Sequence, residues 1–151
     1  MGKKLKNLKY YEAVGRRKKA VAIVRLYLVS KNKEITIKNQ KIKAGEILIN
    51  KKPIDQIIKT SYDKTFLLSP LKLTNNQDRF AVSIFVQGGG YQGQLEAMVH
   101  GLTRAIEMVD KETYRPILKK QGLLTRDARK KERRKVGTGG KARRKKQSPK
   151  R

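Results

Sequence analysis

A run of glycines interrupts the middle of the chain, where residues 88–93 read GGGYQG between a predicted strand and a predicted helix. Backbone amides and a helix N-terminus attract an anion at such a junction, which is where nucleotide-binding loops lie. However, no Gly-Lys-Ser/Thr follows the run, and no acidic residue is placed to hold a ribose. The pattern therefore disfavours phosphoryl transfer and dinucleotide binding. Two interpretations remain: the glycines allow a helix to pack closely, or Gly89 and Gly90 bring the backbone close to an RNA phosphate.

The chain has a single histidine, His100, and Arg104 follows it at the spacing of neighbours on a helix. A catalytic histidine needs a partner nucleophile or carboxylate within reach, and no such partner is evident from the sequence. We therefore interpret His100 as a hydrogen-bonding or RNA-facing side chain, and we expect Arg104 to meet water or RNA. No catalytic residue and no enzyme activity are predicted.

Four basic residues directly follow Gly15, where residues 16–19 read RRKK at the entrance to a predicted strand. Such a group is usually a solvated strand edge. Tyr10 and Tyr11 stand shortly before it, and aromatic rings beside basic residues are typical of surfaces that combine base stacking with phosphate contacts. The sequence therefore favours RNA contact at this position.

Positive charge is concentrated at both ends of the chain. The formal net charge is +27, of which residues 1–19 contribute +7, residues 20–125 contribute +8 and residues 126–151 contribute +12. Basic arms flanking a less basic body are typical of a nucleic-acid binder, whose affinity falls steeply as salt rises. Solvated charge on a very soluble protein is the plainer alternative, but self-repulsion at this density destabilises a compact state unless a partner compensates it.

Residues 126–151 are expected to form an extended basic tail. Their only apolar side chains belong to Ala128, Val136 and Ala142, so they cannot bury enough surface to offset the entropy of ordering. They also lack the aromatic and Leu anchors of an interfacial helix, which disfavours a membrane-surface role. Residues 1–125 have a length that suits one globular α+β domain with a basic N-terminal arm.

The composition disfavours metal, cofactor and membrane functions. The chain has no Cys and one His, which removes disulfides, thiolate sites and a histidine zinc cluster. No apolar run approaches the roughly 20 residues that cross a bilayer. The N-terminus lacks the apolar core of a secretory signal. We expect no cofactor, no metal, no small-molecule substrate and no membrane partner.

An α+β body should position the basic residues. Residues 19–29 and 79–87 are rich in β-branched and aromatic side chains and are predicted as strands. Shorter strands are predicted over residues 10–14, broken by Gly15, over 34–38, closing a hairpin through the polar turn at 31–33, and over 47–49.

Residues 94–110 form the clearest predicted helix. Their apolar side chains recur at helical spacing in one stripe: Leu95, Met98, Val99, Leu102, Ile106 and Val109. Shorter helices are predicted from Pro53 onward and over residues 113–121, with Gly122 as a cap. Pro70 leaves residues 61–73 ambiguous, and residues 71–78 do not read as a helix.

Several motifs stand in a recognisable order along the chain. Residues 10–18 hold an aromatic pair and then Gly-Arg-Arg-Lys, and Ile49-Asn50 precedes the first predicted helix. Residues 86–94 and 100–105 read VQGGGYQGQ and HGLTRA, residues 122–129 read GLLTRDAR, residues 132–135 read ERRK, and the chain ends in Lys150-Arg151. Over nearly the whole chain, this ordered set resembles the bacterial-type family of small-subunit ribosomal protein number nine.

The resemblance implies a two-layer α+β sandwich similar to the second domain of ribosomal protein five, with a left-handed βαβ crossover. It implies a structural constituent of the small ribosomal subunit, which binds the 3′ major (head) domain of the rRNA beside neighbouring head proteins. The tail would thread through RNA and touch peptidyl-site tRNA with Lys150 and Arg151. The expected location is the cytoplasmic ribosome of a bacterium, or the ribosome of a plastid or mitochondrion.

Residues and resemblance together predict a set of RNA ligands. The expected rRNA ligands are Tyr10, Arg16, Arg17, Lys18, Lys19, Gly89, Gly90, His100, Arg104, Arg126, Arg129, Arg133, Arg134, Lys141, Arg143 and Arg144. Two departures from the family pattern lie in the tail. Residues 137–144 hold an extra residue and more glycine than usual, and residues 147–151 lack the usual aromatic, with Pro149 stiffening the chain instead.

Two rival functions follow from single features. Charge alone would suit a nucleic-acid chaperone or a DNA-compacting protein, which would bind many polyanions with similar affinity and need no defined tail end. The glycine loop alone would suit an enzyme of phosphoryl transfer, but the chain lacks the Lys and Asp pair that such chemistry requires.

Overall fold

β-Branched and aromatic residues build a five-stranded mixed sheet. The computed structural model describes residues 9–29, 34–37 and 40–133. In their order across the sheet, the strands are β1 (Tyr10–Arg17), β2 (Ala20–Leu28), β7 (Phe80–Gln87), β5 (Ile47–Ile49) and β6 (Lys52–Pro53). Neighbours pair antiparallel except β5 and β7, which are parallel. The strands predicted over residues 19–29, 47–49 and 79–87 are confirmed.

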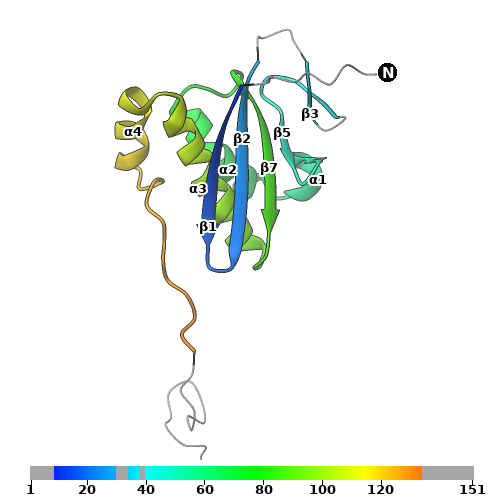
Figure 1. The fold of residues 1–151 in the computed structure, drawn as a ribbon. Helices are drawn as coiled ribbons and strands as arrows, with labels where there is room; N and C mark the ends of the chain where they lie inside the picture. The colour runs from blue at the N-terminus through cyan, green and yellow to red at the C-terminus, as the bar shows by residue number, and fades with distance from the viewer. Residues whose placement is uncertain (1–8, 30–33, 38–39, 134–151) are drawn as a thin grey trace, which may run out of the picture.

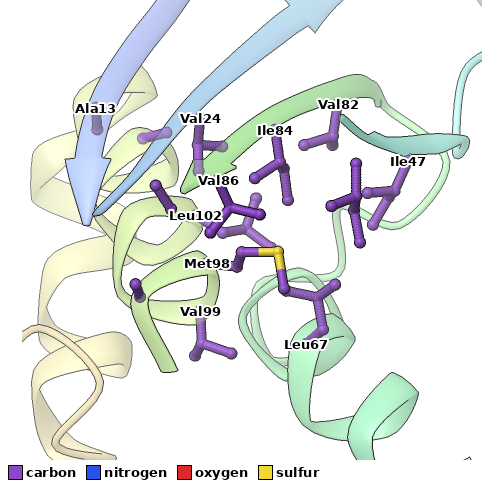
Figure 2. Close-up of a cluster of buried hydrophobic side chains, with 14 of the residues drawn as sticks. Ala13, Val24, Ile47, Leu67, Val82, Ile84, Val86, Met98, Val99 and Leu102 are labelled. Carbon is purple, nitrogen blue, oxygen red and sulfur yellow. The ribbon is translucent and has the colours of Figure 1, made fainter. Parts of the chain in front are cut away.

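Helices cover one face of the sheet, so the predicted α+β fold class is confirmed (Figure 1). The helices are α1 (Ile54–Ile57), α2 (Ser61–Leu73), α3 (Tyr91–Val109) and α4 (Lys111–Lys120). The core lies between the sheet and α2 and α3, where Val24, Ile84 and Val86 face Leu67 and Met98 (Figure 2). The predicted helices over residues 94–110 and 113–121 are confirmed, and each begins slightly earlier than predicted.

A two-stranded hairpin, β3 (Ile35–Ile37) and β4 (Gln40–Ile42), packs on the opposite face of the sheet. Ile35 and Ile42 cover Tyr27 and Ala81, which point away from the helices because side chains alternate along a strand. The prediction that residues 34–38 pair with the strand over 19–29 is wrong. β2 already uses one edge for β1 and the other for β7, so β3 has no edge to join. The predicted turn at 31–33 lies outside the described residues.

Helix α2 runs unbroken through Pro70, so the prediction that residues after 70 are not helical is wrong as far as Leu73. Proline has no N–H, which leaves the carbonyl of Phe66 without its helical donor. The hydroxyl of Ser69 donates to that carbonyl at 2.8 Å and replaces the missing bond. The hydroxyl of Thr74 donates to the Pro70 carbonyl at 2.9 Å where the helix ends.

Asn50 extends the short parallel strand β5 with its side chain. Its Nδ2 donates to the carbonyl of Val86 at 3.0 Å, and its Oδ1 accepts from the Val86 N–H at 2.9 Å. Asn50 and Lys51 have φ values of 47° and 68°, and Asn is among the residues that adopt this left-handed backbone most readily. The Ile49-Asn50 motif therefore has a structural reason: it ends β5 and turns the chain toward α1.

Candidate nucleic-acid interface

Strand β1 and helix α3 touch through two glycines. β1 continues through Gly15 to Arg17, so the strand break predicted at Gly15 is wrong. A Cβ on Gly15 would lie 2.8 Å from the Cα of Gly101, and a Cβ on Gly101 would lie 2.8 Å from Cγ2 of Val24. The two glycines let the backbones meet, which places His100 of α3 beside the basic end of β1.

The loop between β7 and α3 has a structural reason for two of its three glycines. Gly88 and Gly89 have φ values of 74° and 66°, in the left-handed region. Added Cβ atoms there would lie 2.7 Å from the Lys19 carbonyl oxygen and 3.0 Å from the Ala20 nitrogen, so this loop packs on the turn between β1 and β2. Gly90 differs because a Cβ on it would meet open space. Close packing thus explains Gly88 and Gly89, and Gly90 is left free to approach a ligand.

Arg17 is the buried cation of this region, with only 9% of its surface exposed. Its guanidinium pairs with Glu96 of α3 and with Asp127, whose Oδ2 lies 2.9 Å from Nη2. Its Nη1 donates to the carbonyl oxygen of Arg129 at 2.9 Å. One side chain therefore joins β1, α3 and the chain that follows α4. Glu96 and Asp127 were not among the predicted site residues.

Asp127 is held from both sides. The N–H of Arg129 donates to Oδ1 at 2.9 Å, and Nη2 of Arg129 donates to Oδ2 at 2.7 Å. The Arg129 hydrogen bonds, together with the positive charges of Arg129 and Arg17, hold the pKa of the Asp127 carboxyl well below its ordinary value. The carboxylate is therefore ionised throughout the physiological pH range.

His100 lines a small hollow, of about 150 Å³, beside this ion-pair cluster. Its Nδ1 accepts a hydrogen bond from the N–H of Arg16 at 3.4 Å. Burial lowers the pKa of His100, and the charge of Arg104 lowers it further. Arg104 is fixed nearby because its guanidinium donates to the carbonyl of Val14 at 2.6 Å. His100 is thus favoured in its neutral form as an acceptor that ties α3 to β1.

The free energy of unfolding is expected to fall as the pH is lowered from about 7 to 5, because of His100. The unfolded chain has the ordinary histidine pKa of 6.5 and takes up a proton that the folded protein disfavours. Stability therefore rises with pH in this window. Thermal unfolding of the His100→Gln variant should show a flatter pH dependence than the parent chain. Equal slopes in the two proteins would contradict this assignment. The lowered pKa of Asp127 acts only below about pH 4, outside the window.

Exposed basic side chains lie at the end of β1 and in the turn after it, on α3, and along the chain after α4. Those in the described part of the chain are Arg16, Lys18, Lys19, Arg104, Arg126, Arg129, Lys130, Lys131 and Arg133. Figure 1 shows that the chain after α4 runs past the end of β1 and away from the body. The structure therefore brings together most of the predicted ligands that it describes. Six further predicted ligands lie outside the described residues: Arg134, Lys141, Arg143, Arg144, Lys150 and Arg151.

Tyr10 is not part of this group. It lies at the opposite end of β1, with its ring centroid 5.6 Å from that of Tyr27. The guanidinium of Arg25 lies 5.3 Å from the centre of the Tyr10 ring, and the Arg25 Nε donates to Glu12 at 2.6 Å. Tyr10 remains 49% exposed, so any RNA contact that it makes belongs to a separate surface.

The described residues contain neither a metal cluster nor a candidate membrane span. No group of three or more His, Asp or Glu among them is arranged to hold a metal ion. None of their helices is long and apolar enough to cross a bilayer. A larger hollow, of about 630 Å³, is lined by residues of β4, β5, α1 and α2, and it contains none of the predicted site residues.

Comparisons with known proteins place the chain among ribosomal proteins. The family model described as Ribosomal protein S9/S16 matches residues 15–151. The small ribosomal subunit protein uS9 of Maridesulfovibrio salexigens is 44% identical over 128 residues, which cover 85% of this chain and 87% of the relative. The chain therefore belongs to the ribosomal protein S9 family. Membership makes it a structural constituent of the small subunit, a ribonucleoprotein component that binds rRNA in translation, and this is not a class of enzymes.

Proposed function

We propose that the protein binds and stabilises the 3′ major (head) domain of the small-subunit rRNA and contacts peptidyl-site tRNA with its C-terminal tail. The observation that carries the proposal is the set of exposed basic side chains in the β1–β2 turn, on α3 beside β1, and along residues 126–133, which are bonded to β1 through Arg17. Neutralising phosphates there compensates the charge of +27. The mechanism is charge neutralisation with shape fit, and no chemistry is performed.

The work is divided between residues 1–125, which form the globular RNA-binding body, and residues 126–151, which form the tail. In an extended chain at roughly 3.3 Å per residue, the fifteen residues of 137–151 could span about 50 Å. That length lets Lys150 and Arg151 reach a tRNA far from the body. Contacts from Lys and Arg to phosphates position a ligand without reading its sequence, which suits a site that every tRNA occupies. The crossover from β5 through α1 and α2 to β7 is proposed to be left-handed, as in the second domain of ribosomal protein five.

The predicted rRNA ligands have different roles in this proposal. The exposed cations Arg16, Lys18, Lys19, Arg104, Arg126, Arg129 and Arg133 contact phosphates, with Arg134, Lys141, Arg143 and Arg144 continuing along the tail. Gly90, beside open space, lets the start of α3 approach RNA, and Gly89 holds the loop before it on the β1–β2 turn. This helix has no acidic residue in its first turn to repel a phosphate. His100 supports this surface from within. Tyr10 offers a stacking surface at the other end of β1.

The proposed location is the ribosome of a bacterium or of an organelle, beside other head proteins. Sedimentation of salt-washed lysate through a sucrose gradient, followed by quantitative mass spectrometry, tests this. The protein is expected to co-migrate with small subunits at about one copy each, because a shape-fitted site resists salt better than charge contacts alone. Spreading over bulk RNA or DNA, with release by salt, would instead favour the rival chaperone function.

A further inference from the structure

We propose that Arg17 is a clamp that fixes the direction in which the tail leaves the body. The clamp consists of Arg17, Glu96, Asp127 and the carbonyl of Arg129, and the tail begins within it at Arg126. Arg17 thereby acts as a positioning residue for RNA contacts made elsewhere. The inference goes beyond the proposed function, and only its consequence for tRNA rests on that function.

The chemistry of Arg17 favours an internal role. A charged side chain with 10% exposure must be paired to offset its lost hydration, and Arg17 has two carboxylates and a carbonyl as partners. Its planar guanidinium presents donors in several directions, so it can bond the three elements at once. A phosphate would have to displace a carboxylate to reach it. Exposed Arg16 and Lys18 need no such displacement.

The clamp also offsets electrostatic repulsion between the start of the tail and the body. Residues 126–151 carry a net charge of +12, and the basic end of β1 would repel them. Asp127 is one of two acidic residues in that segment, and it lies between the guanidinium groups of Arg17 and Arg129. An attractive contact therefore stands where the chain would otherwise be pushed away from the body.

The clamp fixes backbone as well as charge. Arg17 bonds both the side chain of Asp127 and the main-chain carbonyl of Arg129, two residues apart. Two attachment points restrict rotation of the intervening backbone, where one point would leave the chain free to pivot. Residues beyond Arg129 therefore start from a defined position and direction. A tail that starts in a defined direction loses less entropy when it binds RNA.

Electron paramagnetic resonance on the full-length protein can measure this direction. The chain has no native cysteine, so nitroxides can be attached only at cysteines introduced at Thr65 of α2 and at Lys131, both exposed. The distribution of distances between the labels is compared in the parent chain and in the Asp127→Asn and Arg17→Gln variants. Arg25→Gln is the matched control because it breaks an Arg–Glu pair on the neighbouring strand, away from the tail.

We expect Asp127→Asn and Arg17→Gln to broaden the distribution about twofold or more, because the segment exchanges local order for loop-like motion. Arg25→Gln should leave it unchanged. Cooperative thermal unfolding of each variant shows that the body remains folded. Asp127→Asn is the variant less prone to unfold, because its side chain is partly exposed. An unchanged distribution in both clamp variants, or equal broadening in the control, would overturn the proposal.

Small subunits reconstituted with the same variants separate the clamp from the proposed tRNA contact. If deletion of Lys150 and Arg151 speeds tRNA dissociation, Asp127→Asn is expected to speed it too, and failure to do so overturns the clamp's role in tRNA binding. If the deletion has no effect, the proposed tRNA contact fails, and the distance measurement alone decides the clamp.

Discussion

Replacing Gly15 by Ala is expected to lower the free energy of unfolding by about 3 kcal/mol or more, at the upper end of the cost of overpacking a core. The added methyl group would meet the backbone of α3 at Gly101 and Ala97, and backbone in the middle of a helix cannot rotate aside as a side chain can. To make room, α3 would have to move off β1, and the contact between them is the most extensive that either element makes. A shift of roughly 10 °C in melting temperature corresponds to this loss.

Circular dichroism during thermal and urea unfolding measures the effect, and Gly90→Ala is the matched control. Gly90 lies in the same region, but its φ of −107° suits any residue and a Cβ there meets open space. That variant should unfold within about 0.5 kcal/mol of the parent chain, as surface substitutions usually do. A parent-like melt for Gly15→Ala would mean that β1 and α3 are less closely packed than the structure indicates.

Elements with strong local signals could be predicted from the sequence. The strands over residues 19–29 and 79–87 are dense in β-branched and aromatic residues, and α3 has a continuous apolar stripe, so each pattern points to one structure. Helix α2 could not be predicted because Pro70 is read locally as a helix breaker. The compensating Ser69 hydroxyl bond to Phe66 depends on the helix already being there.

Pairings between residues far apart in the sequence could not be predicted either. The sequence indicates that residues 34–38 are extended, but it does not say which edge is free, and β2 is occupied on both sides. Gly15 reads as a strand break until Gly101, far along the chain, is seen to lie against it. In both cases the missing information is a tertiary contact, and local propensity yields to it.

The predicted site residues remain a prediction, but the structure shows how their surroundings differ. The basic residues at 16–19, predicted at the entrance to the strand over 19–29, lie at the end of β1 and in the turn that follows it. All four residues look alike in sequence, yet Arg17 alternates inward with Gly15 while Arg16 and Lys18 are exposed. The alternation of side chains along a strand distinguishes Arg17 from its neighbours once the strand is known to continue past Gly15. A buried arginine needs a counter-charge, which Glu96 and Asp127 provide.

Removing residues 134–151 is expected to weaken RNA binding strongly while leaving the body folded. The cut falls after the clamp, so Arg17 keeps its partners, and no described contact of the body is lost. The free energy of unfolding should therefore change by less than about 0.5 kcal/mol. The segment holds nine Lys and Arg and no acid. Salt dependence is measured as the slope of log affinity against log salt concentration, and each phosphate contact contributes roughly 0.7–0.9 to the steepness of that slope. The slope for small-subunit RNA should therefore become shallower by several units.

Deleting only Lys150 and Arg151 separates tRNA contact from rRNA contact. Assembly into small subunits should be unaffected, because the other basic residues of the tail remain. Dissociation of peptidyl-site tRNA should become faster by about tenfold for each charge-assisted hydrogen bond lost, since one such bond contributes about 1.5 kcal/mol. Replacing Lys145 and Lys146 by Gln removes the same charge from within the tail, a few residues before its end, and serves as the control. If both variants release tRNA equally fast, the tail acts through its total charge and the chain end has no defined contact. If only the deletion does, Lys150 and Arg151 act at a defined position, which is what a tail directed from a fixed starting point can achieve and a freely pivoting one cannot.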